Sequence, residues 1–160
     1  MGLIIILLAI PTAISKSTFL IKNDWQERTI ELIEKLEGFR ATPYVCEGGL
    51  LTIGFGTKAE SKIQLITPEE ARQKVKDYLY NITFKKIEKY NLTDNQKIAL
   101  SSFDYNTNKM DKLFVDNILH CEKILKYTKV CNKEGCKELN GLVKRRKIEY
   151  DLCINNYNKD

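Results

Sequence analysis

Three residues at fixed spacing carry side chains suited to acid-catalysed hydrolysis: Glu37, Cys46 and Thr52. Eight residues separate the glutamate from the cysteine, and five separate the cysteine from the threonine. A carboxylic acid can donate a proton to a leaving oxygen, and a hydroxyl or thiol can hold a water molecule by hydrogen bonds. Glu47, beside Cys46, is a second carboxylate that stays open as an alternative partner of the acid.

The segment before Glu37 predicts an amphipathic helix that ends at the acid. Apolar residues recur in it at roughly helical spacing: Trp25, Ile30, Ile33 and Leu36. Gly38 follows as a left-handed stop, which places Glu37 in the last helical turn. A carboxyl group there faces the negative end of the helix dipole, which favours the protonated form that a general acid needs.

The residues after Gly38 predict a small, tightly turning antiparallel sheet. Two short apolar runs, 44–45 and 50–53, carry its strands, and Pro43 and several glycines separate them. We expect the helix end and this hairpin to form one wall of a cleft, with the acid at its edge.

The stretch from Glu37 to Thr57 resembles the active-site signature of the phage-type lysozymes, the endolysin-like muramidases of glycoside hydrolase family 24. That signature is Glu, eight residues, Asp or Cys, five residues, Thr, and then Ile-Gly-aromatic-Gly. Three later stretches also resemble the family: T-P-E-E-A, L-T-D-N-Q-K-I-A-L-S-S-F-D-Y-N and G-L-V-K-R-R-K-I-E-Y-D-L. The resemblance covers about residues 25–153, with an insertion over 127–140 and Cys46 where Asp is commoner.

The resemblance implies an α+β lysozyme-like fold, with a small β-containing N-terminal lobe and a mainly helical C-terminal lobe joined by a long helix. It implies hydrolysis of the β-1,4 link between N-acetylmuramic acid and N-acetylglucosamine in peptidoglycan glycan strands, without metal or cofactor. Chitin cleavage or lytic transglycosylase activity in the same cleft is the enzymatic alternative. A non-catalytic peptidoglycan-binding protein is the alternative from another class.

The resemblance also assigns roles to residues. Glu37 is the expected proton donor, and Cys46 and Thr52 are expected to position the attacking water. One acid without an obvious paired carboxylate fits water attack better than a covalent intermediate. Phe55 and Asn106 are expected to bind substrate. Arg145 or Arg146 is expected either to pair with Glu37 or to dock the last helix on the core.

The length of 160 residues and the net charge of +5 fit one basic globular domain. The cluster Lys144–Lys147 is diluted by nearby acids, and no zinc, recognition-helix or RNA-stacking motif accompanies it, so we expect no nucleic-acid partner. We expect a monomer.

The first fifteen residues carry no charged side chain. The run Leu3–Ile10 is too short to span a bilayer, and Ala13-Ile14-Ser15 fits the cleavage rule of a signal peptide. The sequence therefore predicts a signal peptide over 1–15, a secreted domain over 16–160, and no stable membrane insertion. An uncleaved signal anchor is the second possibility.

Four of the five cysteines lie in the last forty residues, an even number in an exported chain. The residues alone leave all three pairings open. The family resemblance implies Cys121–Cys153, which leaves Cys131–Cys136, with Cys46 as a free thiol. No Cys-x-x-Cys spacing occurs and His120 is the only histidine, so a metal site is disfavoured.

Two capping boxes predict the starts of later helices, at Thr67 and Thr93. The first helix is expected to run to about Tyr90, and the second to open the segment from Ile98 to Tyr105. Further helices are expected over 110–126 and 141–155. The apolar residues expected to face inward from the first of these helices are Ala71, Val75, Tyr78, Leu79 and Ile82.

Overall fold

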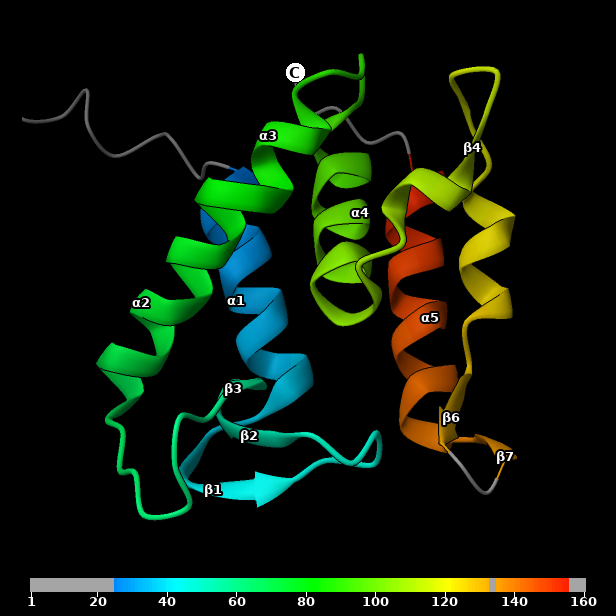
Figure 1. Cartoon of the computed structure of the whole chain (residues 1–160). Coiled ribbons are helices and arrows are strands. Elements are labelled where there is room, and N and C mark those ends of the chain that lie inside the picture. Colours follow the sequence, from blue (N-terminus) through cyan, green and yellow to red (C-terminus); the bar gives the residue numbers. More distant parts are fainter. Residues whose placement is uncertain (1–24, 133–134, 156–160) are drawn as a thin grey trace, which may run out of the picture.

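The computed structural model describes residues 25–132 and 135–155, which form a two-lobed α+β arrangement (Figure 1). The signal peptide expected over 1–15 lies outside the described residues. The first lobe contains helix α1 and a three-stranded antiparallel sheet of order β1-β2-β3. These elements are α1 (Trp25–Glu37), β1 (Arg40–Val45), β2 (Leu51–Gly54) and β3 (Thr57–Lys58).

A long helical segment links the lobes, and two helices form the centre of the second lobe (Figure 1). The link consists of α2 (Pro68–Tyr78), the π-helix η2 (Leu79–Thr83) and α3 (Phe84–Ile87). The central helices are α4 (Asp94–Thr107) and α5 (Asn140–Ile154).

Helix α1 ends where the sequence predicts. Gly38 has a φ of 67°, and its N–H donates to the carbonyl of Glu34 at 3.0 Å. Glycine adopts this left-handed conformation without steric cost. Glu37 is therefore the last helical residue, and the chain turns directly from the acid into β1.

Both capping boxes are confirmed. The Thr67 and Thr93 hydroxyls accept the backbone N–H groups of Glu70 and Gln96, whose side chains accept the threonine N–H groups in return. These local bonds satisfy donors that a helix start leaves unpaired, so α2 and α4 begin at the expected residues.

The prediction that Ile82 faces inward is wrong. The π-helix inserts an extra residue into the turn, so the buried position moves from Ile82, which is 41% exposed, to Thr83. Thr83 donates to Asp104 at 3.2 Å in the buried contact between this segment and α4.

The predicted helix over 110–126 is also wrong. The chain instead forms two short 3₁₀ helices around a hairpin, because Asp116 and Asn117 have φ values of 49° and 64°. Such a pair makes the tight turn of a hairpin and cannot continue a helix. The elements are η3 (Met110–Leu113), β4 (Phe114–Val115), β5 (Ile118–Leu119) and η4 (Cys121–Lys126).

A last hairpin lies in the segment that departs from the family pattern. It pairs β6 (Lys129–Asn132) with β7 (Gly135–Glu138), and Cys131 lies opposite Cys136. The structure joins these two cysteines in a disulfide and joins Cys121 to Cys153 in another. The pairs are the expected ones, and Cys46 is the free thiol.

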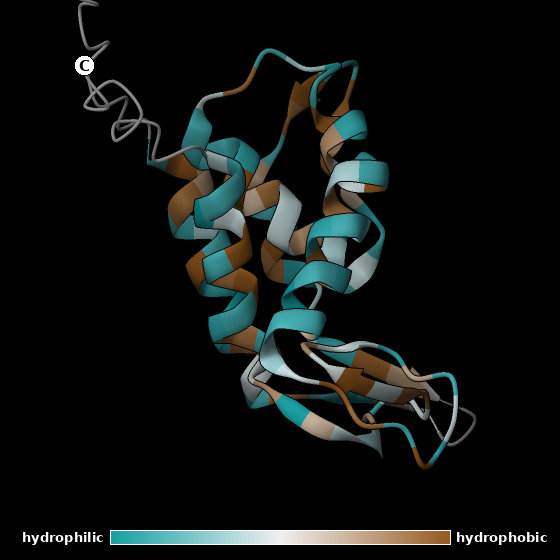
Figure 2. Ribbon diagram, turned by 90° about the vertical axis from the view of Figure 1, so that its left-hand side faces the viewer, coloured by the Kyte–Doolittle hydropathy of each residue, from teal (hydrophilic) through white to brown (hydrophobic). Residues whose placement is uncertain are grey.

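Each lobe has its own group of buried apolar residues, and Trp25 packs against both. Hydrophobic and hydrophilic residues alternate around the helices in Figure 2, as amphipathic packing requires. None of the helices within 25–132 and 135–155 combines the length and apolar character that a membrane span needs.

Candidate active site

Glu37 lies at the junction of the two lobes. Its side chain is 17% exposed, and its Oε1 accepts a hydrogen bond from Arg145 Nη1 of α5 at 2.5 Å. The glycine run packs against the same carboxylate, because a Cβ atom on Gly56 would lie 2.9 Å from Glu37 Oε2. Gly56 also has a φ of 78°, so both space and backbone conformation require glycine beside the acid.

Arg145 is held from several sides. Its Nε donates to Glu149 Oε1 at 3.0 Å, and its Nη2 donates to the Ser102 carbonyl at 3.0 Å. The Ser102 hydroxyl donates to Glu149 Oε1 at 2.7 Å, completing a buried network. Burial alone would lower the pKa of Arg145, but the charges of Glu37 and Glu149 outweigh it and raise the pKa. The guanidinium is therefore a fixed cation beside the acid.

Arg146 has a different role. It is fully buried; its Nη2 donates to Asn106 Oδ1 at 2.7 Å, and its Cζ lies 5.0 Å from the centre of the Phe103 ring. Burial lowers its pKa to about 10, against the opposing effect of Glu149, whose Oε2 is 3.2 Å from Nε. The structure thus pairs Arg145 with the acid, whereas Arg146 docks α5 on α4 and orients Asn106.

Cys46 and Thr52 lie on the β1–β2 hairpin. Thr52 is 7% exposed, and its hydroxyl donates to the Tyr44 carbonyl at 3.3 Å. Cys46 follows β1, and its backbone N–H and carbonyl bond to Leu50 and Gly49 at 2.9 and 2.8 Å. The turn fixes the Cys46 backbone and leaves its thiol half-buried.

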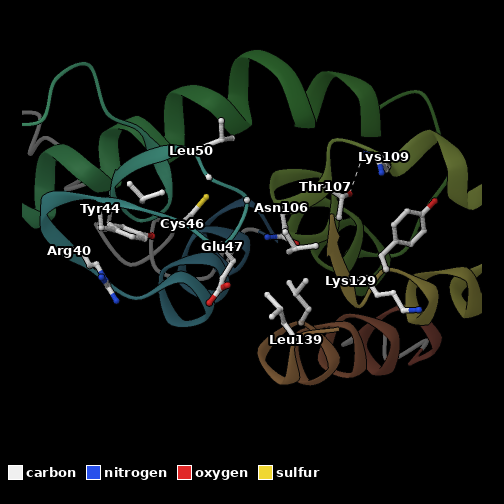
Figure 3. A pocket seen from close by; sticks show the side chains of 16 residues that line it. Arg40, Tyr44, Cys46, Glu47, Leu50, Asn106, Thr107, Lys109, Lys129 and Leu139 are labelled. Carbon is white, nitrogen blue, oxygen red and sulfur yellow. Dashed lines mark hydrogen bonds between the residues drawn. The ribbon is translucent and has the colours of Figure 1, made fainter. Parts of the chain in front are cut away.

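A cavity of about 900 Å³ opens between the hairpin and the second lobe (Figure 3). Cys46, Glu47 and Asn106 all line it, whereas Glu37, Thr52 and Phe55 are not among its lining residues. The hairpin wall also includes Arg40, Tyr44, Val45, Gly48, Gly49 and Leu50. The opposite wall is formed by Thr107, Lys109, Tyr127, Lys129, Val130, Leu139 and Leu142.

Phe55, expected to bind substrate, lies in the hydrophobic core. Its side chain is 8% exposed, and its ring centre is 5.6 Å from that of Phe39. Its backbone carbonyl accepts a hydrogen bond from the Tyr105 hydroxyl at 2.7 Å. The structure therefore places Phe55 as a packing residue that α4 holds through its main chain.

The sequence reasoning missed Tyr105 and Glu149 as parts of the site. Tyr105 ties α4 to the glycine run beside Glu37, and burial, with the charge of Glu37, raises its pKa above the usual range. The sequence indicated Tyr105 only as an aromatic residue with a hydroxyl group at the end of the apolar face of a predicted helix. Glu149 was signalled by its position four residues after Arg145, which places both on one face of a helix.

No three His, Cys, Asp or Glu side chains are grouped to hold a metal ion in the part of the chain that the structure describes.

The sequence and the fold both match known proteins. The family model for phage lysozyme matches residues 34–149. An endolysin of Bacillus phage B103 is 31% identical over an alignment of 143 residues, and the alignment covers 82% of this chain and 54% of the relative. The chain thus spans about half the length of that relative.

Solved structures share the fold at low sequence identity. The endolysin from Escherichia coli O157:H7 phage FAHEc1 superposes with a TM-score of 0.69 at 22% identity, covering 86% of this chain and 97% of that one. The muramidase domain of SpmX from Asticaccaulis excentricus gives 0.66 at 23% identity, covering 80% and 95%. These likenesses confirm the lysozyme-like fold. Because the family model spans the segment that contains Glu37, Cys46 and Thr52, the chain belongs to the phage lysozyme family.

Proposed function

We propose that this protein is a lysozyme that hydrolyses the β-1,4 bond between N-acetylmuramic acid and N-acetylglucosamine in peptidoglycan, acting as a monomer. The observation that carries the proposal is the Glu37 carboxyl group, held by Arg145 at the junction of the lobes. The cavity of about 900 Å³ between the lobes offers room for a glycan strand. The names of the relatives, endolysin and muramidase domain, support the same substrate.

In this proposal Glu37 gives its proton to the leaving oxygen as the bond between that oxygen and C1 of the sugar breaks. Arg145 does not bind Glu37 alone, because Glu149 and the Ser102 carbonyl share the guanidinium. The guanidinium is thereby held in place and fixes the orientation of the Glu37 carboxyl group.

Water then adds its oxygen to C1 from the opposite face of the sugar and loses one proton to the solvent, and a proton from the solvent restores the Glu37 carboxylic acid. The Thr52 hydroxyl donates its proton to the Tyr44 carbonyl, so what it offers a water molecule is its oxygen lone pairs. The Cys46 thiol lines the cavity and offers a second contact. Glu47 also lines the cavity and is the alternative to Cys46 in this role.

Product analysis tests the reaction directly. Purified peptidoglycan is digested, the new reducing ends are reduced with borohydride, and the fragments are identified by mass spectrometry. We expect reduced muramic acid ends from the wild type and none from Glu37→Gln. Ends carrying 1,6-anhydromuramic acid would instead establish a lytic transglycosylase, and cleavage of chitin oligomers a chitinase. Wall binding without any new ends would leave a binding protein.

We also propose export through the apolar segment 1–15. This segment has the length of a signal-peptide core followed by a small-x-small cleavage site. N-terminal sequencing of the exported protein should find Lys16 as its first residue. A protein that retains Met1 and stays with the membrane would instead carry a signal anchor.

A further inference from the structure

The wall of the cavity opposite the β1–β2 hairpin carries two lysines, Lys109 and Lys129 (Figure 3). Both are exposed, and the ion pairs formed within residues 25–132 and 135–155 include neither of them. By contrast, Lys86 pairs with Asp104 of α4, and Lys147 pairs with Asp151 of its own helix. Two cations that face a cavity without a protein counter-ion are suited to an anionic ligand.

Aromatic packing fixes the position of the first lysine. Lys109 Nζ lies 5.6 Å from the centre of the Tyr127 ring, a distance at which a cation is attracted to the aromatic face. The Tyr127 ring in turn packs edge-on against Phe103 of α4, with centres 5.0 Å apart. Lys109 is therefore directed by a ring that the second lobe holds.

The inserted hairpin carries the second lysine. Lys129 opens β6, and the Cys131–Cys136 disulfide closes the β6–β7 hairpin. Glu138 is the cross-strand partner of Lys129, but its Oε2 accepts a hydrogen bond from the Thr128 hydroxyl at 2.7 Å. The nearest carboxylate by register is thus engaged beside the lysine and forms no ion pair with it among the described residues.

The other residues that line the cavity indicate which kind of anionic ligand it suits. Across the cavity, Arg40 stacks over the Tyr44 ring at 4.3 Å, and Glu47 is the only carboxylate among the residues that line the cavity. Apolar side chains fill much of the remaining surface: Val45, Leu50, Val130, Leu139 and Leu142. Cations beside apolar surface favour a ligand that carries carboxylates and small apolar groups.

We propose that Lys109, Tyr127 and Lys129 form a subsite for the carboxylate-bearing substituent of a peptidoglycan strand. A chain of β-1,4-linked N-acetylhexosamines without lactyl groups is uncharged. The carboxylates of peptidoglycan therefore lie on the peptide or, where no peptide is attached, on the free lactyl group of muramic acid. The inference rests on the proposed function, because it assumes a glycan strand in the cavity. It assigns the inserted hairpin to substrate recognition.

Binding to protein that cannot turn over its ligand tests the subsite. Isothermal titration calorimetry on the Glu37→Gln protein compares three soluble ligands: peptide-bearing glycan fragments, the same fragments after removal of the peptide by an amidase, and a neutral chitin oligomer. The Lys109→Gln/Lys129→Gln double variant is compared with Lys126→Gln. Lys126 is exposed next to Tyr127 and lies outside the cavity lining, so it is a matched control.

We expect the double variant to bind the peptide-bearing fragment about fivefold more weakly, as loss of two exposed ion pairs predicts. Lys126→Gln should bind like its parent, and neutral chitin should bind both proteins equally. The difference should vanish in 1 M salt, where charges are screened beyond about 3 Å. Weakening with the peptide-bearing fragments would identify a carboxylate of the peptide, because their lactyl carboxyl group is an uncharged amide. Weakening only with the amidase-treated fragments would identify the free lactyl carboxylate.

Two results would overturn the subsite: unchanged binding of both anionic ligands, or an equal loss with neutral chitin. Both lysines are exposed, so the double variant should unfold at the wild-type temperature, which separates a binding defect from a folding defect. Failure of the proposed function gives a different pattern. Wild-type protein would then release no new reducing ends, whatever the charge dependence of binding.

Discussion

Glu37 and Cys46, the two ends of the proposed site, lie in surroundings of opposite kinds. The acid faces Arg145, which Ser102 and Glu149 hold in a buried network. The Cys46 thiol forms no side-chain hydrogen bond with the residues that the structure describes, and only backbone contacts of its turn hold it. In the proposed mechanism the protein thus fixes the orientation of the proton donor, whereas a group that positions water has to keep hydrogen-bonding capacity for the water.

The largest effect should come from the acid itself. Glu37→Gln keeps the shape of the side chain but has no carboxylic proton, so we expect the rate of wall hydrolysis to fall by about 10²–10⁴. Folding should persist, because Glu149 still compensates Arg145. Turbidity loss of a wall suspension and circular dichroism measure the two properties. A folded Glu37→Gln protein that lyses walls near the wild-type rate would rule out Glu37 as the acid.

Removal of the buried Glu149 carboxylate, which pairs with Arg145, should lower the stability of the protein. Glu149→Gln leaves two buried guanidinium groups without their shared partner, so the free energy of unfolding should fall by about 3–5 kcal/mol in urea denaturation. Asp151→Asn on the same helix removes the exposed ion pair with Lys147 and should cost less than about 1 kcal/mol. Similar losses of stability for the two variants would contradict the view that the buried network around Arg145 is what holds this helix.

The two disulfides should contribute unequally to the free energy of unfolding. Cys121–Cys153 spans 32 residues and ties η4 to the helix that carries Arg145, so replacing both cysteines by alanine should cost roughly 4 kcal/mol. Cys131–Cys136 spans 5 residues, and its loss should cost roughly 2 kcal/mol in the same loop-closure model. Urea denaturation of the two double variants measures this. A larger loss for the short loop would contradict the ranking.

At Cys46, which the protein holds only through backbone hydrogen bonds, a change of side chain should affect the rate more than the stability. Cys46→Ala removes a water-positioning group, and we expect activity to fall about tenfold or more, while Cys46→Asp retains activity because Asp is the family's other choice. Alkylation should inactivate the wild type without a reductant. Glu47→Gln is the matched control and should stay active. If Cys46→Ala is fully active and Glu47→Gln is not, Glu47 is the partner of the acid.

The smallest effect should lie at the link between the lobes. Tyr105→Phe removes the hydroxyl that donates to the Phe55 carbonyl, and the free energy of unfolding should fall by about 1–2 kcal/mol. Tyr78 packs edge-on against the same ring at 5.3 Å, and Tyr78→Phe should be near neutral because its ring contact is kept. A near-neutral result for Tyr105→Phe as well would show that ring packing, and not the Tyr105 hydroxyl, holds this link.

Local signals predicted most of the fold. The Glu37–Gly38 helix end and the two threonine capping boxes were predictable because each is decided by a few neighbouring residues. The helix expected over 110–126 failed because two residues in left-handed conformation, Asp116 and Asn117, form a hairpin turn that apolar spacing does not reveal.

The site was less predictable than the fold. Arg145 and Arg146 are adjacent on one helix, and which of them meets the acid depends on how α5 rotates against α4. That rotation is set by packing, with Phe103, Ser102 and Asn106 on the facing helix. The burial of Phe55 likewise follows from how α4 meets the glycine run, through contacts between residues far apart in the sequence.

The π-helix over Leu79–Thr83 gives the linking segment a change of phase. Each residue of a regular α-helix turns the chain by about 100°, and the wider turn of the π-helix takes up one extra residue, so the residues that face inward after it are shifted by one position along the sequence. Ala71 and Val75 face the core of the first lobe, while Ile87 faces that of the second. A regular α-helix of the same sequence would place Ile87, sixteen residues after Ala71, on nearly the opposite face. The short π-helix thus keeps the inward face of the segment continuous, so that a single rod serves two cores.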